Sequence, residues 1–173
     1  MKNLIIYLLF VLFPLITWSQ STKKGSSIYF IENYSEIDAK RYFDNATNLE
    51  SIEGIWIKDG VKYSIEKDLS DYSRNANRYR VVVLTEKKDW IWDRGDIQYF
   101  LIPGATENIF EVTFYAIVAN WSSGEREYGI QPVLAVGILS NAVSFTVQLP
   151  NFDDYGREVG YSNEVFIKLY PKQ

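Results

Sequence analysis

The sequence predicts an all-β protein, an antiparallel up-and-down barrel of eight strands or, as the alternative, a β-sandwich. Two observations favour this class. From residue 52 onward, short segments that alternate apolar and polar residues follow one another, with polar turns between them. A helical pattern occurs in one short stretch before them. We therefore expect a single β-barrel domain over residues 36–173, which begins with a short helix before its first strand.

The N-terminus has the pattern of a secretory signal peptide. Lys2 is followed by an apolar run over residues 4–16 and by small residues that end at Ser19. This run is too short for the roughly 20 residues that cross a bilayer. We predict cleavage near Ser19-Gln20, which removes residues 1–19 and leaves no stable membrane anchor. The protein is then secreted or periplasmic, and residues 20–35 form a flexible N-terminal segment.

A short helix is predicted over residues 35–45. Ser35 is a suitable N-cap, and Asp38 stands three residues later, where its carboxylate can complete a capping box. Ile37, Arg41 and Tyr42 recur at helical spacing.

The first two strands form the clearest hairpin. The runs 54–58 and 61–66 meet at Asp59-Gly60, a dipeptide typical of a two-residue type I′ turn. In the second run the apolar residues Val61, Tyr63 and Ile65 alternate with polar ones. The polar face, made by Lys62, Ser64 and Glu66, is expected to meet solvent.

Six further strands are expected along the rest of the chain. The strand around residue 132 should start after Pro132, carry a bulge or lie at an edge, because proline cannot donate to a ladder. The predicted ranges are 78–86, 96–102, 109–118, 127–137, 142–149 and 164–170.

The composition excludes several chemistries. Histidine and cysteine are both absent, which removes nucleophile–imidazole pairs, histidine-ligated metals and disulfides. An exported protein without disulfides favours a bacterial source. The acidic pairs Asp93–Asp96 and Asp153–Asp154 lie too close in the chain to flank a glycosidic bond. We expect no enzymatic activity, no cofactor and no metal site.

The charge argues against two classes of partner. The whole chain carries a net charge of −4, and loss of Lys2 with the signal peptide makes the mature chain more negative. Nucleic acids and anionic lipids select basic surfaces. Neither is expected as a partner.

The segment Gly54-Ile55-Trp56, which follows the short helix and opens the first strand, resembles the Gly-x-Trp signature of the lipocalin and calycin barrels. This resemblance implies that Gly54 lets the chain enter the barrel tightly and that Trp56 plugs its closed end. It also implies that a basic side chain of the last strand, here Lys168, covers the indole. The late Thr-Asp-Tyr motif of the family has no counterpart in residues 137–149.

The candidate site lies at the opposite, open end. If the strands run up and down, the loops near residues 59–60, 87–95, 119–126 and 150–163 meet there. The three longer loops combine aromatic rings with arginines, which is the composition of a binding hot spot. The same rings could instead fold over the mouth as a cap. The predicted ligand-binding residues are Trp90, Trp92, Arg94, Trp121, Arg126, Phe152, Tyr155, Arg157 and Tyr161.

Two functions follow from this interpretation. The first is an exported non-enzymatic barrel that binds a small apolar or amphipathic molecule at its open end. The alternative is an interaction module with a solid barrel core, whose open-end loops bind a protein or a glycan.

Overall fold

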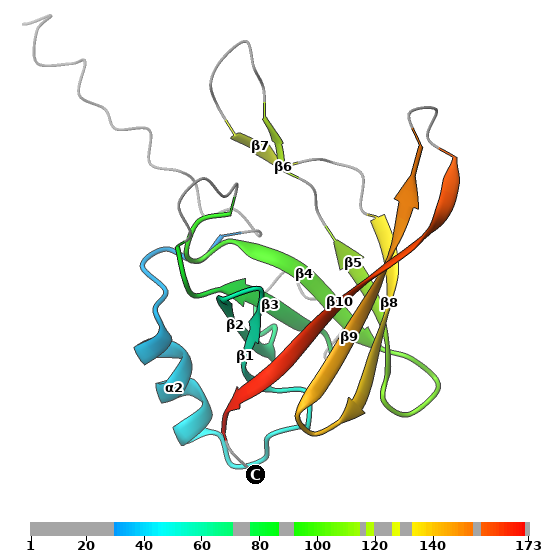
Figure 1. Cartoon of the computed structure of the whole chain (residues 1–173). Coiled ribbons are helices and arrows are strands. Elements are labelled where there is room, and N and C mark those ends of the chain that lie inside the picture. Colours follow the sequence, from blue (N-terminus) through cyan, green and yellow to red (C-terminus); the bar gives the residue numbers. More distant parts are fainter. Residues whose placement is uncertain are drawn as a thin grey trace, which may run out of the picture.

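The computed structural model describes residues 30–70, 77–86, 92–114, 117–119, 126–128, 133–153 and 157–171 (Figure 1). The predicted signal peptide and its cleavage site lie outside the described residues, so export stays a prediction. Among the residues described, no helix is long and apolar enough to span a membrane.

Eight strands form a closed antiparallel barrel, which confirms the predicted fold class and excludes the sandwich. Each barrel strand pairs with the next one in the chain, and the last strand closes the sheet by pairing with the first. The barrel strands are β1 (Gly54–Lys58), β2 (Val61–Lys67), β3 (Tyr79–Val83), β4 (Ile97–Pro103), β5 (Ile109–Phe114), β8 (Val133–Asn141), β9 (Ser144–Phe152) and β10 (Glu158–Tyr170).

The β1–β2 turn has the predicted chemistry. Asp59 and Gly60 both have positive φ angles, of 51° and 80°. A type I′ turn requires this conformation at both central residues.

The short helix is α2 (Glu36–Asn45), capped by Ser35 and Asp38 in the predicted capping box. Of the three residues at helical spacing, Tyr42 packs partly against the barrel. Ala39 and Phe43 are buried against the barrel, whereas Ile37 is 70% exposed. Helical spacing alone predicts a stripe, and the direction in which the helix docks decides which stripe is covered.

Two predicted strands are each divided in two. The run 109–118 contains β5 and the start of the short β6 (Ile117–Ala119), and the run 127–137 contains the end of β7 (Arg126–Tyr128) and the start of β8. The strands β6 and β7 pair only with each other and form a separate hairpin (Figure 1). Strand β8 begins at Val133, the residue after Pro132, which matches the first of the three predicted arrangements.

The last hairpin is longer than predicted. Pairing between β10 and β9 continues to Glu158 and Phe152, whereas pairing between β10 and β1 ends at Ile57 and Ile167. The two strands therefore rise beyond β1 as a ribbon along one side of the open end (Figure 1). The sequence predicts a loop over residues 150–163, but β9 continues to Phe152 and β10 begins at Glu158, with a bulge between Glu158 and Gly160.

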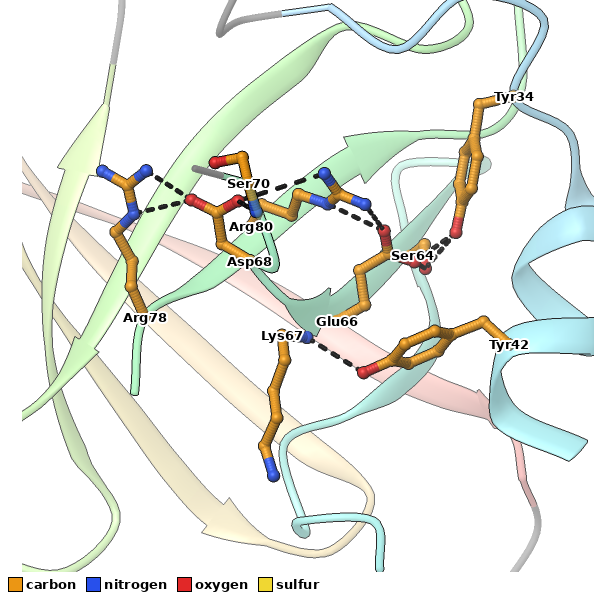
Figure 2. Close-up of polar contacts among 9 residues, drawn as sticks. All are labelled: Tyr34, Tyr42, Ser64, Glu66, Lys67, Asp68, Ser70, Arg78 and Arg80. Atoms are coloured by element: carbon orange, nitrogen blue, oxygen red, sulfur yellow. Dashed lines mark hydrogen bonds and ion pairs between the residues drawn. The ribbon is translucent and has the colours of Figure 1, made fainter. Parts of the chain in front are cut away.

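Residues 30–35, the described part of the segment predicted to be flexible, are bound to the barrel. The backbone N–H of Ile31 donates to the carbonyl of Gly95 (2.9 Å), and the hydroxyl of Tyr34 donates to Glu66. This contact corrects the expected exposure of the polar face of β2. Ser64 and Glu66 are only 0% and 1% exposed, because the N-terminal segment covers them (Figure 2).

Aromatic side chains fill the centre of the barrel. Phe145 lies between Trp56 and Phe166, with ring centroids 6.3 and 5.9 Å away, and Tyr63 packs against Phe166 at 5.3 Å. None of these four side chains is measurably exposed. The centre is a packed core with no room for a further molecule among these rings.

The outer wall of β8, β9 and β10 exposes many apolar side chains to solvent, with the polar residues Thr146 and Gln148 of β9 among them. Most of the exposed large apolar side chains among the residues described lie on this wall or next to it: Ile109, Leu134, Val136, Val143, Val159, Tyr161, Val165, Ile167 and Leu169.

Candidate functional site

The predicted site residues do not form one cluster. Trp90, Trp121 and Tyr155 lie outside the described residues, and for Arg126 in β7 and Phe152 in β9 the structure describes the backbone. The structure describes four further side chains of this set, and they do not lie together: Trp92, Arg94, Arg157 and Tyr161.

Trp92 is a core residue. It is only 4% exposed and belongs to the main apolar cluster inside the barrel. Of the two interpretations of the aromatic loops, this burial matches the cap, since a side chain at a binding rim would keep an exposed ring.

The other three side chains lie on the surface. Arg157 bonds to Asp153 with its Nε (2.8 Å) and is exposed. The Nε of Arg94 lies 3.8 Å from Oε1 of Glu86. Tyr161 is 63% exposed and pairs with Pro150 on the outer face of β10, so its ring faces away from the barrel interior.

Sequence reasoning missed a charged cluster inside the mouth of the barrel, which we call the mouth cluster: Lys58, Tyr99 and Glu164. The ammonium of Lys58 lies 2.8 Å from Oε1 of Glu164, and the hydroxyl of Tyr99 donates to Oε2. The three residues come from β1, β4 and β10. A closed barrel brings them together because alternate residues of every strand face the same interior.

The position of the mouth cluster follows from strand pairing. Glu164 is opposite Val147, which is fully buried, so both side chains face the interior. Exposure then rises along this inner face of β10, from 0% at Phe166 to 25% at the Glu164 side chain, and Ser162 beyond it is exposed. The carboxylate therefore lies where the packed core ends and the mouth begins.

Apolar side chains surround the mouth cluster. Phe114 and Leu149 are partly buried and pack against the core, and Leu149 is opposite Ser162. The ring of Phe114 lies 5.8 Å from that of Tyr99. Apolar walls with a few placed polar groups are the usual composition of a small-molecule site.

Burial and negative charge both act on the phenols below the mouth. Burial raises the pKa of Tyr99 well above its usual range, and the charge of Glu164 raises it further. Burial also raises the pKa of Tyr63, with smaller contributions from Glu164 and Asp59. Both phenols therefore stay protonated at neutral pH, and Tyr99 acts as a hydrogen-bond donor.

The closed end matches the predicted arrangement of Gly54, Trp56 and Lys168. Trp56 and Lys168 are opposite each other in the β1–β10 pair, and the ammonium lies 5.3 Å from the indole centroid. It also donates to the carbonyl of Ser51 (2.7 Å). The predicted contact between the tryptophan and a basic residue of the last strand is confirmed.

A second charged cluster lies on the outer side of β2 and β3 (Figure 2). Arg80 donates to Glu66 through Nε (2.8 Å), and Arg78 donates to Asp68 through Nε (2.8 Å). Burial alone would raise the pKa of Asp68, but hydrogen bonds from Ser70 and the adjacent arginine lower it below its usual value. Every acid in this cluster has an arginine partner, so it is best explained as an internal network that holds residues 30–35 on the barrel.

The closed end also carries a pocket of about 360 Å³. Ile52, Tyr79, Phe110 and Leu139 form its apolar part, and Glu50 and Lys67 are among its polar residues. Burial and the negative charges of Glu50 and Glu53 raise the pKa of Tyr79 to about 12. The pocket lies at the opposite end from the predicted loops.

Within the residues that the structure describes, no group of three or more acidic side chains is placed to hold a metal ion.

Comparison with known proteins gives no family whose model matches the chain, no similar curated protein and no similar solved structure. The class of protein therefore rests on the architecture. A closed eight-stranded up-and-down barrel with an aromatic core is consistent with a lipocalin-like fold.

Proposed function

We propose that this chain is an exported, non-enzymatic barrel protein that binds a small amphipathic molecule at its open end. The observation that carries the proposal is Glu164. Its carboxylate faces the barrel interior, is held by Lys58 and Tyr99, and still reaches solvent at the mouth.

An ion pair inside a barrel is a poor way to stabilise the fold, so its presence favours a functional role. Removing two charges from water costs several kcal/mol per ion, and apolar residues of similar volume often serve stability as well or better. The centre of this barrel is already filled by aromatic side chains. A charged group at the boundary between that core and the mouth supports a role in recognition.

The filled centre limits where the molecule can bind. Trp56, Phe145 and Phe166 occupy the interior below the mouth cluster. A ligand must therefore lie above Glu164, against Leu149, Phe114 and the β9–β10 ribbon. This placement differs from a deep central cavity and favours a small ligand.

One observation favours the alternative function, an interaction module with a solid core. The outer wall of β8, β9 and β10 exposes Leu134 (73%) on β8 and Val165 (47%) on β10, with the outward-facing Thr146 and Gln148 of β9 between these strands. Exposed apolar side chains of this kind can mark a protein contact. It would act through the outside of the barrel, so it is separable from binding at the mouth.

A pair of neighbouring substitutions tests binding at the mouth. Ser162 faces the interior and Asn163 faces the outside, and both are exposed, so a tryptophan at either position should leave the core intact. The probe is the neutral fluorophore N-phenyl-1-naphthylamine, titrated into the mature protein. We expect Ser162→Trp to weaken binding by about tenfold or more, equivalent to 1.4 kcal/mol, and Asn163→Trp to leave it unchanged.

Equal binding by both variants would place the probe elsewhere, and no binding by the wild-type protein would overturn the proposal. In the second case, association of the wild-type protein with a partner that Val165→Lys abolishes would support the interaction module.

A further inference from the structure

We propose that the molecule bound at the mouth carries a positively charged amine and that Glu164 receives this group. This inference rests on the proposed function, because it concerns the same site and names the chemical class of its ligand.

The carboxylate of Glu164 has acceptor capacity to spare. An ionised carboxylate offers about four lone-pair positions to donors. Among the residues described, Lys58 bonds to Oε1 and Tyr99 donates to Oε2. An ammonium group with its three donors could therefore add hydrogen bonds without displacing either partner.

Glu164, and not Lys58, is the charge that an incoming molecule meets. The side chain of Glu164 is 25% exposed, whereas that of Lys58 is 7% exposed. The Lys58 ammonium lies below, 5.4 Å from the ring centroid of Phe166 and 5.9 Å from that of Tyr63. These rings and the carboxylate already satisfy it, so it is poorly placed to attract an anion from the mouth.

The surrounding charges point the same way. Asp59 lies close enough to raise the pKa of Tyr63, so a second acid adds negative potential near the mouth. The two predicted site arginines whose side chains are described have acids beside them, Arg157 with Asp153 and Arg94 with Glu86. They therefore offset little of this potential.

The walls suit the apolar part of such an amine. Phe114 and Leu149 stand beside the cluster and are partly buried. A ring or short alkyl chain attached to the amine would pack on them, while its charge faces Glu164. An ammonium brings a full positive charge and three donors to the carboxylate, where an alcohol of the same shape brings one neutral donor, which favours the amine.

Two probes of matching shape and opposite charge test the inference: 1-naphthylmethylamine and 1-naphthaleneacetate. Isothermal titration of the mature protein measures the dissociation constant of each at neutral pH. We expect the amine to bind at least about tenfold more tightly than the acid, a difference of about 1.4 kcal/mol. Tighter binding of the acid, or equal binding, would overturn the inference while leaving the proposed function intact.

Three variants assign the preference to the mouth cluster. Glu164→Gln keeps the shape and removes the charge, so the ratio of the two constants should fall to within about threefold of unity. Lys58→Met leaves the carboxylate without its cation and should increase the preference for the amine. Glu111→Gln is the matched control, because Glu111 is an exposed acid on β5, outside the barrel interior, and the ratio should not change.

Glu164→Gln also leaves the Lys58 ammonium without an acid, which can destabilise the fold. The double variant Lys58→Met, Glu164→Gln removes both charges and serves where the single variant unfolds. A tenfold preference that persists in this double variant would show that another group selects the amine and would overturn the inference. If neither probe nor N-phenyl-1-naphthylamine binds the wild-type protein, the proposed function itself fails.

Discussion

Trp56 closes one end of the barrel with an indole that is fully buried. Its Nε1 donates to the carbonyl of Ile52 (2.9 Å), so the polar edge of the ring is satisfied inside the core. Lys168 covers the ring from the last strand. Burial lowers the pKa of this lysine, and Glu53 opposes the shift.

These contacts predict the effects of truncation at Trp56 and Lys168. Trp56→Ala leaves a large cavity and should lower the free energy of unfolding by about 3–5 kcal/mol. Lys168→Ala loses a cation over a ring and should cost about 0.5–2 kcal/mol. Because the residues touch, a double-mutant cycle measured by denaturant unfolding should be non-additive. Additive losses would show that the ammonium does not stabilise the indole.

At the scale of elements, the entry of the chain into β1 depends on a glycine. Gly54 has a φ angle of 153°, which side-chain-bearing residues rarely adopt. A Cβ there would overlap the backbone carbonyl oxygen of Tyr170 and lie 2.6 Å from Cε of Lys168. The first and last strands can therefore meet at the closed end only when this position has no side chain.

Gly160 on β10 provides a matched comparison. Its φ angle is 146°, and nothing lies within 4 Å of the position that a Cβ would take. Gly160→Ala should cost about 1–3 kcal/mol of backbone strain. Gly54→Ala should cost about 1–3 kcal/mol more, because it adds a steric overlap. Urea unfolding of both variants measures the difference, and equal losses would mean that the closed end adapts to the extra methyl group.

Over the whole molecule, the two faces of β10 have opposite environments. Phe166 is fully buried among the aromatic side chains of the core, and its neighbour Val165 is 47% exposed on the outer wall. The closed sheet produces this contrast, because each strand turns alternate residues towards a single interior.

Truncating these neighbours should therefore have unequal effects. Phe166→Ala creates a cavity beneath the mouth cluster and should cost about 3–5 kcal/mol. Val165→Ala removes surface that is already exposed and should change the free energy of unfolding by less than about 0.5 kcal/mol. Thermal or denaturant unfolding measures both. A large loss at Val165 would indicate that the outer wall is covered in solution, as in a self-associated protein.

The sequence by itself determined the features that depend on local chemistry. The capping box at Ser35 and the Asp59-Gly60 turn are properties of neighbouring residues, and both appear as predicted. Apolar–polar alternation located the barrel strands but did not determine which of their sides are buried. The contact between Trp56 and Lys168 was also predictable, but from the resemblance to a known family. The strand count followed from these local patterns, and the closed barrel is the arrangement in which all eight strands pair.

Only the tertiary structure decided which polar residues are buried and which of them meet. Ser64 and Glu66 were expected at the surface, and Glu164 was an ordinary polar position in a predicted strand. Alternation assigns a residue to one side of a strand, but it does not say what covers that side. Tyr34 covers Glu66 from 32 residues away in the chain, and Tyr99 meets Glu164 across 65 residues. Such contacts form when distant strands and segments close around one core, and for that reason the mouth cluster could not be found from the sequence.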